Sequence, residues 1–207
     1  MRLSLLFLFG VTALFAKAQK NSTISSDTIF FDDFNSNTNK WIDDNDKHAT
    51  TKIENGIYYL AATGRAYGGG QEIKIDAHKD FEIEARIKIM DGDADHRNNY
   101  SMLFWGREAM DGYYFTFAGD AFASIQNCNG KNQSDCVVQS KSLQKTWLNP
   151  NDFNVYTIRK QGNTYSFLIN NKLFYQMPFT PFFGNLTGVG AGRKVALAID
   201  YFKVIYL

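Results

Sequence analysis

The stretch FEIEARIKI, from Phe81 to Ile89, decides the fold of this chain. Apolar side chains occupy every second position, at Phe81, Ile83, Ala85, Ile87 and Ile89. The positions between them are charged: Glu82, Glu84, Arg86 and Lys88. Strict alternation over nine residues is typical of a β-strand with one core face and one solvated face. Such a strand needs a second sheet to cover its apolar side.

The rest of the chain supplies further strand patterns separated by turn residues. They fall at residues 28–32, 52–63, 71–76, 100–106, 112–118, 121–126, 153–160, 164–174 and 195–207. No stretch after residue 27 sustains a helical apolar period, and Gly68–Gly70 is interpreted as a turn or bulge. We therefore predict an all-β, single-domain, two-sheet antiparallel β-sandwich over residues 28–207, with at most a helical turn or two in the loops.

The first residues have the pattern of a secretory signal peptide. Arg2 precedes an apolar run at residues 5–15, and Ala16-Lys17-Ala18 follows as an A-x-A cleavage site. A membrane anchor is the alternative, but the run is shorter than the roughly 20 apolar residues of a spanning helix. No cysteine follows the site, so no lipobox is predicted. We expect cleavage after Ala18, a flexible lead-in at residues 19–27, and a periplasmic or extracellular protein.

The charge balance indicates an uncharged partner. Without Arg2 and Lys17 the chain has 20 basic and 21 acidic residues, a formal net charge of −1. It contains no basic block, so nucleic acid is not an expected partner, and no later stretch is apolar enough to span a membrane. These observations favour a neutral ligand outside the cytoplasm, and the resemblance and aromatic residues described below make a neutral glycan or cell-surface polysaccharide the expected partner. They do not predict an oligomeric state.

Several motifs recur along the chain in a recognisable order. The opening Asp32-Asp33-Phe34, with Asn37 and Trp41, has the pattern D-D-F-x-x-N-x-x-x-W. The remaining motifs, in order, are Ile53/Gly56/Tyr58/Leu60, Phe81–Ala85, the strand from Gly112, and Ile199–Phe202. Together they resemble secreted bacterial domains of the concanavalin A-like lectin and glucanase superfamily, which includes laminin-G-like domains and family 16 glycoside hydrolases. The resemblance implies a jelly roll of two stacked antiparallel sheets, with any ligand in a concave face.

The catalytic signature of the family 16 hydrolases is missing from this chain. Those enzymes place carboxylates on one strand as E-x-D-x-x-E, whereas Glu82 and Glu84 are followed by Arg86 and Lys88. Ionised glutamates on a solvated strand face would not act as general acids, which need a raised pKa. We therefore expect a non-catalytic module. A glycoside hydrolase whose carboxylates come from loops, acting on a polysaccharide or disaccharide, stays open as the alternative.

The resemblance also implies a structural calcium ion. In domains of this kind a carboxylate on the last strand and backbone oxygens near the first strands hold such an ion. The matching positions here are Asp200, Gly56, and Phe30 or Phe31. An Asp200 that only caps backbone N–H groups is the alternative.

The chain has two cysteines, Cys128 and Cys136. An isolated pair in an exported protein predicts a disulfide, which here would close a short polar loop. Neither cysteine belongs to a C-x-x-C motif, so the predicted bond is structural.

A glycan site needs an aromatic platform with polar groups at its edge. Trp105, Arg107, Glu108 and Tyr114 offer that mixture on or beside central strands, and we predict them as ligand-binding residues. The alternative is that Trp105 and Tyr114 are core residues of a protein with 18 Phe and 11 Tyr. Trp41 is assigned to the core, where it would fix the opening loop.

Overall fold

The computed structural model describes residues 27–91, 100–108, 111–129, 137–180 and 184–207. Their regular structure is almost entirely β-strand, with one short 3-10 helix, η2 (Lys145–Trp147). The strands, in chain order, are β1 (Thr28–Asp32), β2 (Ala49–Glu54), β3 (Ile57–Ala62), β4 (Tyr67–Glu72), β5 (Phe81–Asp91), β6 (Ser101–Glu108), β7 (Asp111–Phe117), β8 (Phe122–Asn129), β9 (Val137–Ser142), β10 (Asn154–Gln161), β11 (Thr164–Ile169), β12 (Lys172–Pro178), β13 (Leu186–Ala191) and β14 (Val195–Tyr206).

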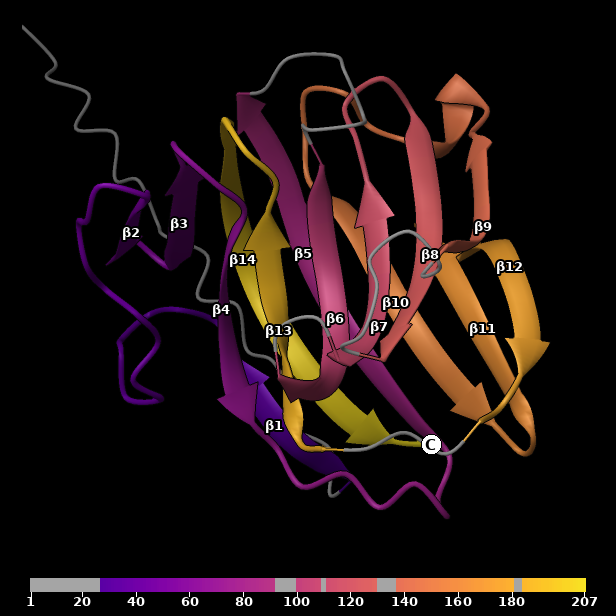
Figure 1. Cartoon of the computed structure of the whole chain (residues 1–207). Helices are drawn as coiled ribbons and strands as arrows, with labels where there is room; N and C mark the ends of the chain where they lie inside the picture. The colour runs from indigo at the N-terminus through magenta and orange to yellow at the C-terminus, as the bar shows by residue number, and fades with distance from the viewer. Residues whose placement is uncertain (1–26, 92–99, 109–110, 130–136, 181–183) are drawn as a thin grey trace, which may run out of the picture.

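The strands form two antiparallel sheets, which lie one in front of the other in Figure 1. The eight-stranded sheet has the order β12-β11-β10-β5-β14-β3-β2, and β1 pairs with β14 beside this path. The six-stranded sheet has the order β4-β13-β6-β7-β8-β9. Because inward side chains of both sheets form one buried apolar cluster, the fold is a two-sheet β-sandwich, as predicted.

Strand β5 is the centre of the eight-stranded sheet. It pairs with β14 on one side and β10 on the other, with Ile83 opposite Val204 and Ile158. Its predicted inward residues Phe81, Ile83, Ala85 and Ile87 are all essentially inaccessible to solvent. The alternation of FEIEARIKI therefore correctly indicates which side of this strand packs on the second sheet.

Aromatic side chains fill the space between the sheets. Phe115 and Phe117 project inward from β7, and Tyr156 and Phe167 meet them from β10 and β11. The rings of Phe117 and Tyr156 are parallel to within 8°, and Phe115 meets Phe167 edge to face. Both arrangements are favourable for aromatic pairs.

The opening motif has a structural role. The Asp32 carboxylate accepts hydrogen bonds from the Trp41 indole Nε1 (2.8 Å), the Asn39 amide (2.8 Å) and the Phe34 backbone N–H (2.8 Å). Trp41 is buried against Phe34 and Tyr58, so its predicted core position is confirmed. The loop after β1 is thereby fixed against the core.

The structure differs from the predicted strands in five details. Gly68–Gly70 are part of β4, not a turn, and β4 ends at Glu72 where a strand to Asp76 was predicted. Strands β9 and β13 were not predicted as strands. The single strand expected at 164–174 is a hairpin, because Asn170 and Asn171 adopt positive φ angles of 49° and 62° and turn the chain.

Two further predictions concern the membrane and the cysteines. Across the described ranges, no helix has the length and apolar character needed to cross a membrane.

Cys128 is buried in β8, and no free cysteine occurs among the described residues. Cys136 lies outside them, so its pairing with Cys128 stays a prediction. The proposed signal peptide and most of the lead-in also lie outside the described residues.

Candidate functional site

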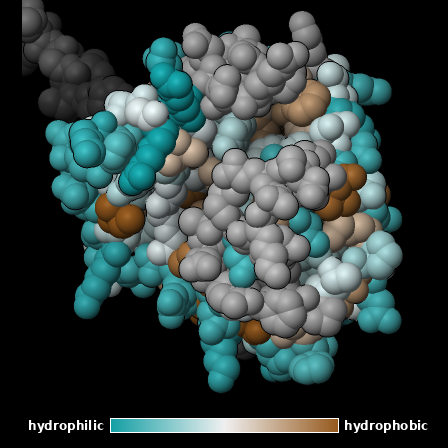
Figure 2. Space-filling view, viewed as in Figure 1, coloured by the Kyte–Doolittle hydropathy of each residue, from teal (hydrophilic) through white to brown (hydrophobic). Residues whose placement is uncertain are grey.

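The predicted ligand-binding residues all come from β6 and β7, the two middle strands of the six-stranded sheet. Strand alternation divides them between two faces. Leu103, Trp105, Tyr113 and Phe115 point into the sandwich, whereas Met102, Phe104, Tyr114 and Thr116 occupy the outward positions. Figure 2 views the molecule from the side of this sheet, with hydrophilic residues around much of the rim.

The prediction that Trp105 stacks on a ligand was wrong. Its side chain is only 2% exposed and packs edge to face on Phe81 and Tyr165, with ring centroids 5.1 and 6.3 Å away. Trp105 is two residues after the buried Leu103 on the same strand, so both side chains point to the core face. The alternative interpretation of Trp105, a core residue, is therefore the correct one.

Tyr114 lies on the outward face, beside an aromatic residue that the sequence analysis missed. Phe104 is directly opposite Tyr114 in the β6–β7 ladder. Their ring centroids are 6.2 Å apart and their planes differ by 31°. Both side chains are partly exposed. The signal for Phe104 was present in the sequence, because its position alternates with that of the buried Trp105.

The other two predicted residues, Arg107 and Glu108, belong to the end of β6. Their side chains are outside what the structure describes, so their roles stay predictions. They follow Gly106, where the ladder with β7 is irregular before Glu108 pairs with Asp111.

Neutral polar side chains continue the row of Phe104 and Tyr114 across the sheet. Gln126 lies opposite Tyr114, and Ser124 lies opposite Thr116. The hydroxyl oxygens of Thr116 and Ser124 are 2.7 Å apart, and Gln126 Nε2 donates to Ser124 Oγ over 3.4 Å. This chain of contacts orients the Gln126 amide beside the aromatic pair. Thr116 and Ser124 are themselves buried, so the partly exposed Gln126 amide is the neutral hydrogen-bonding group that accompanies the two rings.

Carboxylates are scarce on this face. Among strand residues whose side chains are described, Glu72 at the end of edge strand β4 is the one acid at an outward position. Within the described ranges, no three His, Cys, Asp or Glu side chains are grouped so that they could hold a metal ion. The described strand side chains of this face therefore do not include the pair of acids that glycoside hydrolysis uses.

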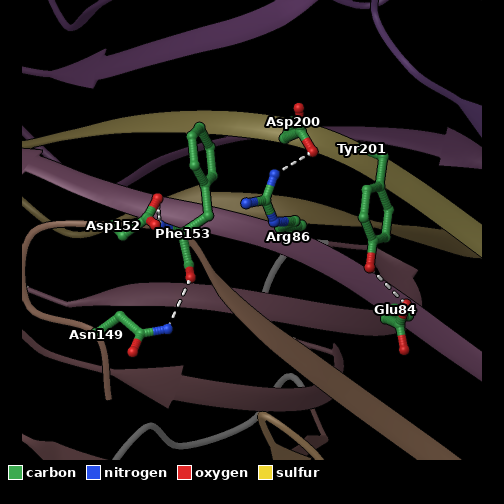
Figure 3. Close-up of polar contacts among 7 residues, drawn as sticks. All are labelled: Glu84, Arg86, Asn149, Asp152, Phe153, Asp200 and Tyr201. Carbon is green, nitrogen blue, oxygen red and sulfur yellow. Dashed lines mark hydrogen bonds and ion pairs between the residues drawn. The ribbon is translucent and has the colours of Figure 1, made fainter. Parts of the chain in front are cut away.

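The outward face of the eight-stranded sheet is chemically different, because its charges bind one another. Glu84 Oε1 accepts hydrogen bonds from Tyr201 (2.8 Å) and Lys203 (2.8 Å), and Oε2 accepts one from Thr157 (3.1 Å). Figure 3 shows the contact of Tyr201 with Glu84 across neighbouring strands. Burial, and next the charge of Glu84, raise the pKa of Tyr201. Both carboxylate oxygens of Glu84 are satisfied within the sheet.

The expected solvated face at Glu82 and Glu84 was wrong in this respect. The two residues are only 7% and 8% exposed, because partners from adjacent strands cover them. Glu82 accepts a hydrogen bond from Arg159 Nε at 2.5 Å. The basic partners come from β10 and β14 and not from Arg86 and Lys88 of the same strand. Carboxylates held this way stabilise the sheet and are poorly placed for chemistry.

Asp200, the predicted calcium ligand, has a cationic partner of its own. Arg86 Nη1 donates to Asp200 Oδ2 over 2.6 Å, as Figure 3 shows. The Arg86 guanidinium also lies 4.6 Å from the ring centre of Phe153. Phe30 and Gly56 belong to β1 and to the β2–β3 turn, both in the same sheet as Asp200. A calcium ion at the Asp200 carboxylate would have to compete with Arg86, and the described geometry does not require one.

Two stacked antiparallel sheets with a polar, aromatic outer face define a concanavalin A-like jelly-roll domain of the lectin and glucanase type. Residues 28–180 match the sequence model of one protein family. The chain belongs to the family of 3-keto-alpha-glucoside-1,2-lyase-like domains. A search of curated protein sequences found no match.

Solved structures support the same fold at low sequence identity. The carbohydrate recognition domain of Emp47p is 13% identical and has a TM-score of 0.65, over 89% of this chain and 99% of that one. The Bacillus licheniformis β-glucanase is 12% identical with a TM-score of 0.61, over 88% and 99% of the two chains. The carbohydrate-binding module CBM66 from Bacillus subtilis is 12% identical with a TM-score of 0.50, over 88% and 98%. These neighbours include both binding domains and an enzyme, so they establish the fold alone.

Proposed function

We propose that this protein is an exported, non-catalytic module that binds a neutral glycan on the outward face of the six-stranded sheet. The aromatic pair of Phe104 and Tyr114 carries the proposal. Sugars present apolar C–H faces with hydroxyl groups at the edge, and aromatic rings beside neutral polar groups match that surface. Family membership and the carbohydrate-binding domains among the structural neighbours support the same ligand class.

The distribution of acids favours binding over hydrolysis. A retaining glycosidase needs two carboxyl groups about 5 Å apart, and an inverting enzyme needs two somewhat farther apart. Glu72 is the single described acid at an outward strand position on the proposed face. Glu82 and Glu84 lie on the other sheet and are held by Arg159, Lys203 and Thr157.

The family description supports a second candidate, a lyase acting on a 3-keto-α-glucoside. The ketone at C3 acidifies the proton at C2, so elimination of the C1 substituent needs one base and not two acids. Glu72 is the described carboxylate that could serve on this face. This candidate therefore makes a distinct prediction: activity on a 3-keto-α-glucoside that Glu72→Gln abolishes.

The two candidates are separated by assaying the same purified protein twice. Retention on immobilised neutral polysaccharides, without release of reducing sugar, supports the binding module. Consumption of a 3-keto-α-glucoside with formation of an unsaturated product supports the lyase and overturns the non-catalytic proposal. Absence of retention on every neutral polysaccharide tested also overturns it.

A further inference from the structure

Four glycines leave four adjacent outward positions of β4 and β13 without side chains, and Glu72 and Leu186 occupy the next outward positions of the same ladder. Gly68 and Gly70 of β4 face Gly190 and Gly188 of β13 in the ladder, and we call these four residues the glycine floor. A Cβ on Gly188 would collide with the Gly69 carbonyl, and one on Gly190 would lie 3.0 Å from the Met102 side chain. The two strands are thus bare where other strands carry side chains.

The Phe104 ring extends over this floor. Its Cε1 lies 3.5 Å from the position of a Cβ on Gly68, and its Cζ lies 3.1 Å from that of a Cβ on Gly70. Phe104 belongs to β6, which is separated from β4 by β13. Neighbouring strands are about 4.8 Å apart, so β6 and β4 are separated by two such intervals. The Phe104 side chain reaches the positions above β4 only if it lies along the sheet.

The ring of Tyr114, on the adjacent strand β7, has a similar orientation to the ring of Phe104. Its ring centroid is 6.2 Å from that of Phe104, and the planes differ by only 31°. Two rings that lie along a sheet present their faces outward, whereas upright rings present their edges. A ring face is the part of an aromatic side chain that packs on an apolar C–H surface.

We propose that the glycine floor holds Phe104 flat as a stacking platform for pyranose units with an unobstructed C–H face, in which the ring substituents are equatorial. The proposal rests on the proposed function and specifies its ligand class. An axial hydroxyl on the stacked face would separate the sugar from the ring and lose that contact. Gln126, oriented by Ser124, supplies hydrogen bonding at the edge of the platform.

The test compares two hexasaccharides by calorimetry: β-1,4-linked glucose, with all substituents equatorial, and β-1,4-linked mannose, with an axial O2. We expect the glucose chain to bind the wild-type protein more tightly. Phe104→Ala should weaken that binding about two- to tenfold without lowering the melting temperature by more than a few degrees. Gly70→Ala should weaken it as well, because the new Cβ would lie 3.1 Å from Phe104 Cζ, beside the Thr187 carbonyl oxygen (3.0 Å) and Leu186 Cδ1 (3.2 Å). Gly119→Ala is the matched control, because a Cβ there meets nothing within 4 Å.

The outcomes separate this inference from the proposed function. Equal binding of both sugars, still dependent on Phe104, overturns the ligand class and leaves glycan binding intact. Unchanged binding in a folded Gly70→Ala variant overturns the role of the floor. If Gly70→Ala does not fold, Phe104→Ala decides alone: unchanged binding of the glucose chain overturns the platform. Binding of neither hexasaccharide, with retention on another neutral polysaccharide, overturns the inference only, and retention on none overturns both.

Discussion

Arg86 and Asp200 join the two central strands of the eight-stranded sheet, with Arg86 Nη1 2.6 Å from Asp200 Oδ2. The pair lies where the β5–β14 ladder changes register, between Ile199 and Tyr201. An irregular ladder gives up some regular pairing, and a charge-assisted hydrogen bond across it contributes stability at that point.

This pair predicts that Asp200 stabilises the protein without calcium. In a double-mutant cycle of Arg86→Ala and Asp200→Ala, measured by urea unfolding with a chelator present, we expect a coupling free energy of about 0.5 to 3 kcal/mol. A melting temperature that chelation lowers in the wild type, and not in Asp200→Ala, would show instead that the carboxylate holds a calcium ion.

Trp105→Ala should destabilise the fold. The side chain is buried among Phe81 and Tyr165, and truncation of a buried Trp costs about 3 to 5 kcal/mol. Equilibrium unfolding in denaturant measures the effect, and Tyr114→Ala, at a partly exposed position of the neighbouring strand, should cost clearly less. Equal stability of the wild type and Trp105→Ala would contradict the core assignment.

The hydrogen bonds of Asp80 to the β10–β11 turn should make the free energy of unfolding depend on pH. Its carboxylate accepts hydrogen bonds from the Gly162 N–H (2.8 Å) and Lys160 Nζ (3.2 Å), and these lower its pKa in that order of importance. Because the folded pKa is depressed, the stabilisation is complete above the unfolded value of about 4 and is lost as pH falls through the folded pKa. The difference in unfolding midpoint between wild type and Asp80→Asn should therefore shrink in acid. A difference that stays constant from pH 7 to strong acid would rule this out.

Cys128 and Cys136 should form a disulfide in the exported protein. Thiol labelling of the denatured, unreduced protein is expected to modify neither residue, and labelling after reduction should modify both. Two labelled cysteines before reduction would show that the bond is absent.

Much of the fold could be predicted because alternation in strands such as β5 states directly which face is buried. The strands that escaped prediction have weak local signals. β4 reads YGGGQE and β13 reads LTGVGA, and glycine has little intrinsic preference for a strand. Strand β13 pairs with β6 on one side and with β4 on the other, and neither pairing is visible in a local window of sequence. The glycines that concealed these strands are also those that form the floor under Phe104.

The candidate site was only half predicted for a related reason. The predicted residues lie on β6 and β7 and include Trp105 but not Phe104, since a tryptophan suggests stacking more strongly. Strand parity opposes that choice, because Trp105 shares its face with Leu103 and Phe104 shares its face with Tyr114 opposite. The charged partners of Glu84 were hidden for another reason: Lys203 is more than a hundred residues away and meets it only through the β5–β14 pairing.

The most direct test of the central claim is affinity electrophoresis of the protein through gels that contain neutral polysaccharides. The wild type should be retarded by at least one of them, without release of reducing sugar. The Phe104→Ala/Tyr114→Ala variant should lose the retardation, and Tyr59→Ala, a partly exposed aromatic on the outward side of the other sheet, should keep it. Retardation that survives in a folded Phe104→Ala/Tyr114→Ala variant, or that is lost in Tyr59→Ala alone, would contradict binding on the six-stranded sheet.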